Sequence, residues 1–209
     1  MEDAIVFVVD DDPDVRDALS SLFESVGLRV QTFASATEML LRELPSVPSC
    51  LVLDIRLPKL SGLDLQFELS AKGIVIPIVF MTGHGDIPMS VQAMKAGAID
   101  FLTKPFREQE MLDAVTGALD RDRKRRDKER SGLDARTRFA SLTPRERQIM
   151  ALITGGLMNK QVAGRLGISE MTVKIHRGSV MRKMRVKSIA DLVLIAESLG
   201  VRGHGPEGL

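Results

Sequence analysis

The chain has 209 residues, of which 44% are hydrophobic and 27% charged, and its formal net charge is +1. This composition is ordinary for a globular protein and argues against disorder over the whole length. No apolar run approaches the ~18 residues of a membrane span. Met1 is followed by two acidic residues, so we expect no secretory signal. The single cysteine, Cys50, excludes an internal disulfide and a multi-thiolate zinc site, and we expect a cytoplasmic protein with no membrane partner.

Charge divides the chain into unlike parts. Residues 1–120 carry 19 acidic and nine basic side chains, residues 121–138 carry four and nine, and residues 139–209 carry five and eleven. The asymmetry predicts two domains, 1–120 and 139–209, joined by a charged linker at 121–138. A basic half suggests a polyanion such as nucleic acid, although charge alone fits an ordinary basic surface about as well.

The segment 121–138 is almost wholly polar and cannot form a core of its own. Its charges alternate in sign, and Asp122 and Arg126 lie at helical spacing. We expect a partly helical, solvated linker that breaks near Ser131 and Gly132 and then becomes flexible.

Strands and helices alternate along residues 1–120. Apolar runs predict strands at 5–9, 28–33, 50–54, 76–82 and 99–102. Helices are expected from Asp12 to Gly27, from Ser35 through Leu44, after Ser61, from Asp86 to Gly97, and from Arg107 onward. The pattern predicts a doubly wound α/β domain, with one five-stranded parallel sheet covered on both faces.

Polar groups follow the expected strand ends, where the functional site of such a fold lies. Asp10 and Asp11 follow the first strand, Asp54 ends the third, Thr82 ends the fourth, and Lys104 follows the fifth. Clustered carboxylates without Cys or His favour Mg²⁺. A carboxylate beside a metal and an ammonium suits phosphoryl transfer. Taken singly, each Asp is explained as a turn residue or a helix cap, and Phe101 fits a core position better than a functional one.

The segments VVDDDPDVR, LVLDIRLPKLSGLDL, FMTGHGD and FLTKPF resemble the receiver domain of two-component response regulators, a flavodoxin-like and CheY-like fold. The resemblance implies that a sensor histidine kinase phosphorylates Asp54. It implies Mg²⁺ ligands and switch or phosphate-binding residues as follows: Asp10, Asp11, Asp54 and the Arg56 carbonyl for the metal; Thr82 and Phe101 as the switch pair; Lys104 for the phosphate. It also implies a cis bond between Lys104 and Pro105, and a tuning role in dephosphorylation for Arg56 and His84.

Four helices are expected in the second half, opened at Thr143, Asn159, Ser169 and Ser188. The second and third, joined by a turn at Gly167, form a helix-turn-helix. Val173, Val180 and Met184 form the core stripe of the third helix, with a packed His176 beside them. The DNA-contacting candidates are Lys160, Glu170, Thr172, Lys174, Ile175, Arg177, Arg182, Lys183 and Arg185. Lys174 and Arg177 suit guanine edges or phosphates, Ile175 a thymine methyl, and Lys160, Arg182, Lys183 and Arg185 the phosphates.

The run LTPRERQIMALITGGLMNKQVAGRLGISEMTVKIHRGSVMRKM resembles the LuxR-type helix-turn-helix of NarL/FixJ response regulators, and the whole chain resembles the FixJ subgroup. Gly178 departs from the pattern, because relatives often carry a longer polar side chain there. The resemblance implies a homodimer, through the last helix on DNA and through residues 87–106 after phosphorylation. An equally good interpretation of the last helix is that its apolar residues only complete the core of its own domain.

We therefore expect a response regulator in which phosphorylation at Asp54 controls dimerisation and promoter binding. Activation of transcription, with RNA polymerase as a partner, is implied by the resemblance. We expect no enzymatic activity beyond self-phosphotransfer and autodephosphorylation. Two alternatives stay open: a hydrolase of phosphate esters, and an adaptor or phosphate sink with a vestigial helix-turn-helix.

Overall fold

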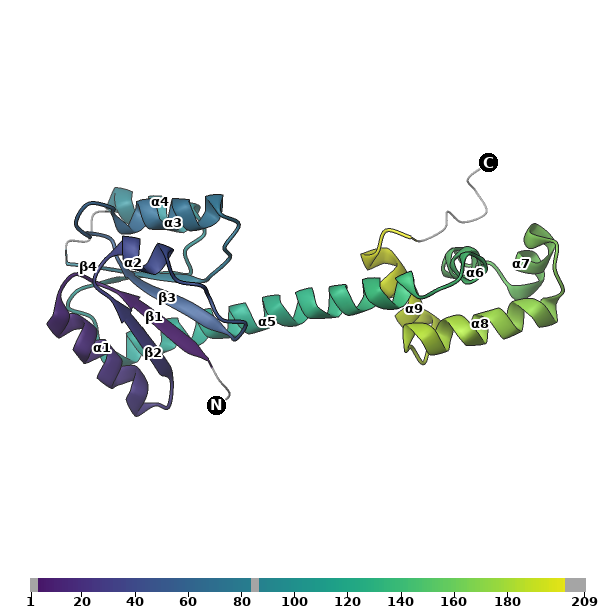
Figure 1. Cartoon of the computed structure of the whole chain (residues 1–209), viewed down its shortest axis with the longest axis horizontal. Coiled ribbons are helices and arrows are strands. Elements are labelled where there is room, and N and C mark those ends of the chain that lie inside the picture. Colours follow the sequence, from purple (N-terminus) through teal and green to yellow (C-terminus); the bar gives the residue numbers. More distant parts are fainter. Residues whose placement is uncertain (1–3, 84–86, 202–209) are drawn as a thin grey trace. The chain divides into compact units, whose positions relative to one another are not determined.

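The computed structural model describes residues 4–83 and 87–201. The chain divides into two compact units, Met1–Arg126 and Asp127–Leu209, and the boundary falls within helix α5, Glu108–Ala140 (Figure 1). None of the helices in these described ranges combines the length and the apolar character needed to cross a membrane.

The first unit is built on a five-stranded parallel sheet, as predicted. Its strands are β1 Ile5–Val9, β2 Arg29–Phe33, β3 Ser49–Asp54, β4 Ile78–Thr82 and β5 Asp100–Thr103, in the spatial order β2-β1-β3-β4-β5. Strand β4 begins two residues later than expected. The reason is Pro77, which has no N–H for the strand ladder and contributes only its carbonyl, to Leu51.

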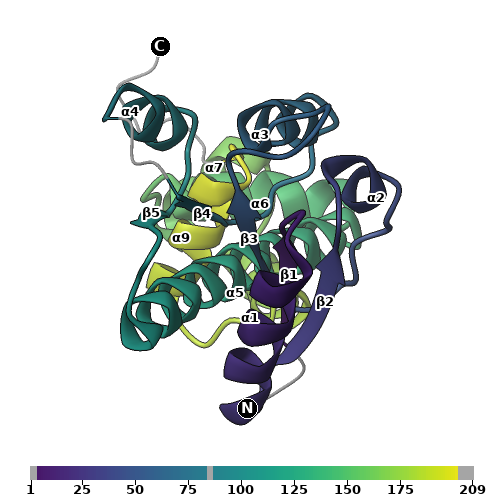
Figure 2. The ribbon, with the colours of Figure 1, turned by 90° about the vertical axis from the view of Figure 1, so that its left-hand side faces the viewer.

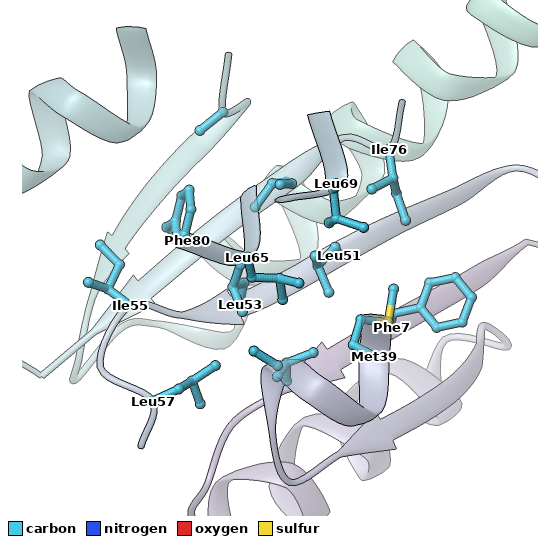
Figure 3. Packing of buried hydrophobic residues seen from close by; sticks show 14 of the residues in the cluster. Phe7, Met39, Leu51, Leu53, Ile55, Leu57, Leu65, Leu69, Ile76 and Phe80 are labelled. Atoms are coloured by element: carbon cyan, nitrogen blue, oxygen red, sulfur yellow. The ribbon is translucent and has the colours of Figure 1, made fainter. Parts of the chain in front are cut away.

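Helices cover both faces of this sheet (Figure 2). One face packs on α1, Pro13–Ser25, and on the first part of α5 through Leu19, Phe23, Met111 and Val115. The other packs on α2 Ala36–Leu40, α3 Gly62–Ala71 and α4 Ile87–Lys95. Figure 3 shows part of this second core, where Leu53, Leu65, Leu69 and Phe80 meet. The doubly wound fold predicted from the sequence is confirmed.

Helix α2 is shorter than expected, ending at Leu40 instead of Leu44. Leu41 is 83% exposed and gains no burial that would favour another helical turn. Pro45 also disfavours a helical conformation at Leu44.

Up to residue 201, the second unit contains four further helices: α6 Pro144–Thr154, α7 Asn159–Leu166, α8 Glu170–Met184 and α9 Ile189–Ser198. Val173, Val180 and Met184 are fully buried in its core, as predicted, and His176 is partly buried beside them. The predicted caps Thr143, Ser169 and Ser188 are confirmed. The prediction for α7 is wrong by one residue: Met158 is the N-cap, because the side chain of Gln161 accepts a hydrogen bond from its N–H.

The expected break near Ser131 and Gly132 is also wrong, because α5 runs unbroken from Glu108 to Ala140. A glycine inside a helix costs only about 1 kcal/mol. Ion pairs one turn apart, Arg130 with Asp127 and Arg138 with Asp134, favour the helix on either side of the expected break. Ala135 is buried near the helix end, so burial also holds the last turns in place.

Candidate functional site

The carboxylates meet where the strand order reverses, between β1 and β3. Val9 pairs with Leu53 in the parallel register, so Asp10 and Asp54 follow at the same edge of the sheet. This is the topological switch point at which open α/β sheets place their sites. Both carboxylates are buried, with Asp10 1% and Asp54 7% exposed.

One ammonium group joins the two carboxylates. Lys104 Nζ lies 2.6 Å from Asp10 Oδ2 and 2.7 Å from Asp54 Oδ2. Burial raises the pKa of Asp10, although the hydrogen bond from Lys104 opposes that rise. Burial acts to lower the pKa of Lys104, but its hydrogen bonds to Asp10 and Asp54 outweigh this and raise it. The ammonium therefore stays charged and offsets one of the two negative charges of the pair.

Backbone groups fix the remaining oxygens. Asp54 Oδ1 accepts a hydrogen bond from the N–H of Arg56 at 2.8 Å, and Asp10 Oδ1 accepts one from the N–H of Asp12 at 2.9 Å. Arg16 donates to the carbonyl oxygen of Asp10 at 2.7 Å. The strand ends are thus held in place by contacts from the loops that follow them and, at Asp10, from α1.

Thr82 and Phe101 lie on neighbouring strands and face the same side of the sheet. The β4–β5 register pairs Phe80 with Phe101 and Thr82 with Thr103, so Thr82 is the diagonal neighbour of Phe101. Thr82 is buried, and its carbonyl accepts from the N–H of Lys104 at 2.7 Å. Phe101 is partly buried against the core that contains α3 and α4. The peptide bond between Lys104 and Pro105 is cis, as expected.

The groups that could bind a metal at the ends of β1 and β3 are oxygen atoms, which are the ligands that Mg²⁺ prefers. The structure brings together Asp10, Asp54 and Lys104, but Asp11 is exposed and does not join them. Among the described residues, no three acidic, histidine or cysteine side chains gather closely enough to form a metal site by themselves. Arg56 has an exposed side chain. His84 lies outside the described residues.

In the second unit, α7 and α8 form the helix-turn-helix around Gly167, which adopts a left-handed conformation with φ 63°. Met171 and Ile175, one turn apart on α8, are 66% and 64% exposed. Lys174 and Gly178 are exposed, and beyond the adjacent residues and the backbone of α8 itself, no atom lies within 4 Å of a Cβ placed on Gly178. Exposed apolar and cationic side chains together on one helix suit a DNA groove. Other exposed candidates are Lys160, Glu170, Arg182 and Arg185, and Thr172 is partly exposed.

Two of the expected DNA-contacting side chains hold α8 against neighbouring helices of the unit. Arg177 donates to Asn159 Oδ1 at 3.2 Å and so ties α8 to the start of α7. Lys183 Nζ lies 2.7 Å from Glu146 Oε2, and Ser179 donates to Glu146 Oε1 at 2.7 Å, so both hold α8 against α6. Arg145 donates to the carbonyl of Leu166 at 2.8 Å. These contacts fix the orientation of the exposed face of α8.

Each half of the chain matches a known protein family. Residues 6–116 match the response regulator receiver domain, and residues 140–196 match the luxR family of bacterial regulatory proteins. The chain is 58% identical over 204 residues to "Nodulation protein W" of Bradyrhizobium diazoefficiens, covering 98% of this chain and 90% of that protein. It is 43% identical over 196 residues to the "Transcriptional regulatory protein FixJ" of Azorhizobium caulinodans, covering 94% of this chain and 93% of that one.

The chain is a response regulator of the NarL/FixJ family. Among solved structures it is similar to the response regulator StyR, with a TM-score of 0.83, 50% identity, and coverage of 93% of this chain and 98% of that one. It is also similar to full-length FixJ from B. japonicum, with a TM-score of 0.58, 39% identity, and coverage of 94% and 97%. The predicted combination of a receiver domain with a LuxR-type DNA-binding domain is confirmed.

Two residues important to this response regulator were missed in the sequence. A Cβ on Gly62 would lie 2.3 Å from the carbonyl oxygen of Asp54, so only glycine fits where α3 begins. The sequence did contain a signal for this close contact, namely a glycine directly after the helix cap Ser61. The second is Asp122, which is 1% exposed and accepts hydrogen bonds from Arg125, Arg126 and the N–H of Ser49. Its helical spacing to Arg126 was visible, but its burial required the fold.

Proposed function

We propose that Asp54 is the phospho-acceptor of this regulator and that a sensor histidine kinase supplies the phosphoryl group. The observation that carries the proposal is the ion triad, in which Lys104 bridges Asp10 and Asp54 at 2.6 and 2.7 Å. A buried carboxylate held beside an ammonium group at the end of β3 is oriented as a nucleophile, and the ammonium offsets charge on the incoming phosphoryl oxygens.

In the proposed step, a carboxylate oxygen of Asp54 attacks the phosphorus of a phosphohistidine. An acyl phosphate O–P bond forms, the P–N bond breaks, and the electron pair and a proton return to the histidine nitrogen. Asp10, Asp54 and the carbonyl oxygen of Arg56 would hold Mg²⁺, with the exposed side chain of Asp11 turning inward to join them, and the ion would supply positive charge at the transferred group. Lys104 would remain with the phosphoryl oxygens after transfer.

The phosphorylated state would be read through Thr82 and Phe101. The Thr82 hydroxyl would donate to the phosphoryl group, and its diagonal neighbour Phe101 would turn inward. This shifts the population of the receiver towards a form that dimerises through the face at residues 87–106. Val91 and Met94, 44% and 45% exposed, supply apolar surface to that face.

The dimer would bind promoter DNA through α8 and act, with RNA polymerase, mainly as an activator in the cytoplasm. Lys174 and Ile175 are exposed and suit base edges, and Lys160, Arg182 and Arg185 are exposed and suit phosphates. Arg182 also donates to Ser179 Oγ at 3.4 Å. Because Arg177 and Lys183 already hold α8 in place, we assign them mainly a positioning role.

No enzymatic turnover is expected beyond phosphorylation and dephosphorylation of Asp54 itself. The test is incubation with a small phosphodonor and Mg²⁺, followed by intact-mass measurement. One acyl phosphate per chain supports the proposal if it is absent from Asp54→Asn and present in Asp17→Asn, which changes an exposed carboxyl of α1. Continuous hydrolysis of phosphate esters would favour the hydrolase instead.

A further inference from the structure

Arg16 of α1 contacts Asp10 but is neither a metal ligand, a nucleophile nor a switch residue of the proposed mechanism. It is the fourth residue of the helix and is partly buried. Its backbone N–H donates to the carbonyl oxygen of Asp12 at 3.2 Å, in the first turn. Leu19 and Phe23, further along α1, are buried in the core that contains β1. The backbone of Arg16 is therefore fixed relative to the end of β1.

The side chain of Arg16 reaches back from α1 to the end of β1. Its Nη1 donates to the carbonyl oxygen of Asp10 at 2.7 Å. A hydrogen bond from an ionised donor is about twice as strong as one between neutral groups. A cation in the first turn of a helix is otherwise disfavoured, because the helix dipole favours anions there. The contact with Asp10 therefore gives the cation at this position a specific partner.

This hydrogen bond fixes the peptide group that joins Asp10 to Asp11. The carbonyl of Asp10 and the N–H of Asp11 lie in one plane, so holding the oxygen limits rotation of the whole peptide group. The N–H of Asp10 also donates to the carbonyl oxygen of Phe33 at 3.3 Å. Its carboxylate oxygens accept from the N–H of Asp12 and from Lys104. Because the Cα of Asp11 belongs to the same plane, the orientation of this peptide determines how the Asp11 carboxylate can turn inward.

We propose that Arg16 is a positioning residue for the Mg²⁺ of this site. By holding the peptide between Asp10 and Asp11, it keeps both carboxylates in the orientation from which they bind the ion, without contacting the ion itself. Removal of a group that orients a metal ligand typically weakens metal binding by about 10–100-fold. The inference rests on the proposed function, because it takes Asp10 and Asp11 as ligands of Mg²⁺.

The test measures Mg²⁺ affinity without a phosphodonor, so that the result does not depend on phosphorylation. Amide resonances of residues 10–12 and 54–56 are followed by NMR while the full chain is titrated with magnesium chloride. Arg16→Met removes the donors but keeps a long, helix-favouring side chain, and it should raise the Kd by about tenfold or more. Arg16→Lys should lie between that variant and wild type, because lysine keeps the charge without the fixed geometry of the guanidinium. Arg42→Met, the same change at an exposed position just after α2, is the control and should bind like wild type.

Two further measurements separate positioning from a purely structural role. Phosphorylation of Arg16→Met at saturating Mg²⁺ should reach the wild-type rate, while the Mg²⁺ concentration for half of that rate rises by the same factor as the Kd. Denaturant unfolding without Mg²⁺ measures stability, and a variant that is less stable but binds Mg²⁺ like wild type overturns the inference. If Arg16→Met does not fold, Arg16→Lys decides in its place, and wild-type affinity in that variant overturns the inference. Absence of Mg²⁺-dependent shifts in wild-type protein is a distinct outcome, because it refutes the proposed metal site and with it this inference.

Discussion

The carboxylate of Asp122 on α5 accepts a hydrogen bond from the N–H of Ser49, the first residue of β3, at 2.9 Å. The two residues are 73 positions apart, and both are buried. Asp54 lies at the other end of the same strand. The charged segment after residue 120 is therefore attached to the strand that carries the phospho-acceptor candidate.

Asp122→Ala should destabilise the receiver unit by about 2 kcal/mol, because the N–H of Ser49 loses its buried acceptor. Arg125 and Arg126 are partly exposed and turn to water, which limits the loss. Denaturant unfolding monitored on receiver amides measures the change. Asp127→Ala, which breaks an exposed ion pair with Arg130, is the control and should cost under ~0.5 kcal/mol. Equal effects of the two variants would refute the buried role of Asp122.

Gly62→Ala should displace the loop after β3 and slow phosphorylation of Asp54. The added Cβ would sit 2.3 Å from the carbonyl oxygen of Asp54. Overpacking of this kind costs about 1–3 kcal/mol. Gly117→Ala is the matched control, because nothing lies within 4 Å of a Cβ there, and it should be neutral or stabilising. Acyl-phosphate formation over time distinguishes them, and a Gly62→Ala protein as fast as wild type would contradict the steric account.

The fold was largely predictable because its signals are local. Apolar runs, caps such as Ser61 and Thr143, and breaks such as Gly27 mark the elements directly in the sequence. The convergence of Asp10, Asp54 and Lys104 also followed, because parallel strands end at one edge. What could not be predicted depends on tertiary contacts. Asp122 looks solvated until Ser49 is placed beside it, and Lys183 looks free until Glu146 is.

Glu146 should make the second unit sensitive to acid. Burial alone would raise its pKa, but hydrogen bonds from Lys183, the N–H of Thr143 and Ser179 outweigh this and lower the pKa to about 2. Since the folded pKa lies below the ordinary value of 4.5, the stabilisation is complete above pH 4.5 and is lost as the pH falls towards 2. Unfolding of this unit measured against pH should show that loss.

Glu146→Gln should lower the stability of the second unit at neutral pH and flatten its dependence between pH 4.5 and 2. Glu170→Gln, at an exposed position in the first turn of α8, is the control and should keep the wild-type profile. If both variants keep that profile, Glu146 is not the titrating group.

Arg182→Ala and Ile175→Ala should weaken DNA binding in different ways. Loss of an exposed phosphate-binding cation reduces affinity for all sequences and lowers the salt slope by about one. Loss of the exposed Ile175 side chain should instead reduce preference for the operator over random DNA, with little change in salt slope. Lys128→Ala, an exposed change on α5, is the control. Identical salt slopes for all three variants would contradict the phosphate role of Arg182.

The most direct test of the account is the DNA affinity of Asp54→Asn with and without a phosphodonor and Mg²⁺. Wild-type protein and the Asp17→Asn control should bind operator DNA more tightly with the donor, within the ~5–150-fold range of allosteric coupling. Asp54→Asn should show one affinity under both conditions, since the amide is not phosphorylated. An Asp54→Asn protein whose affinity rises with the donor as much as that of wild type would contradict the account.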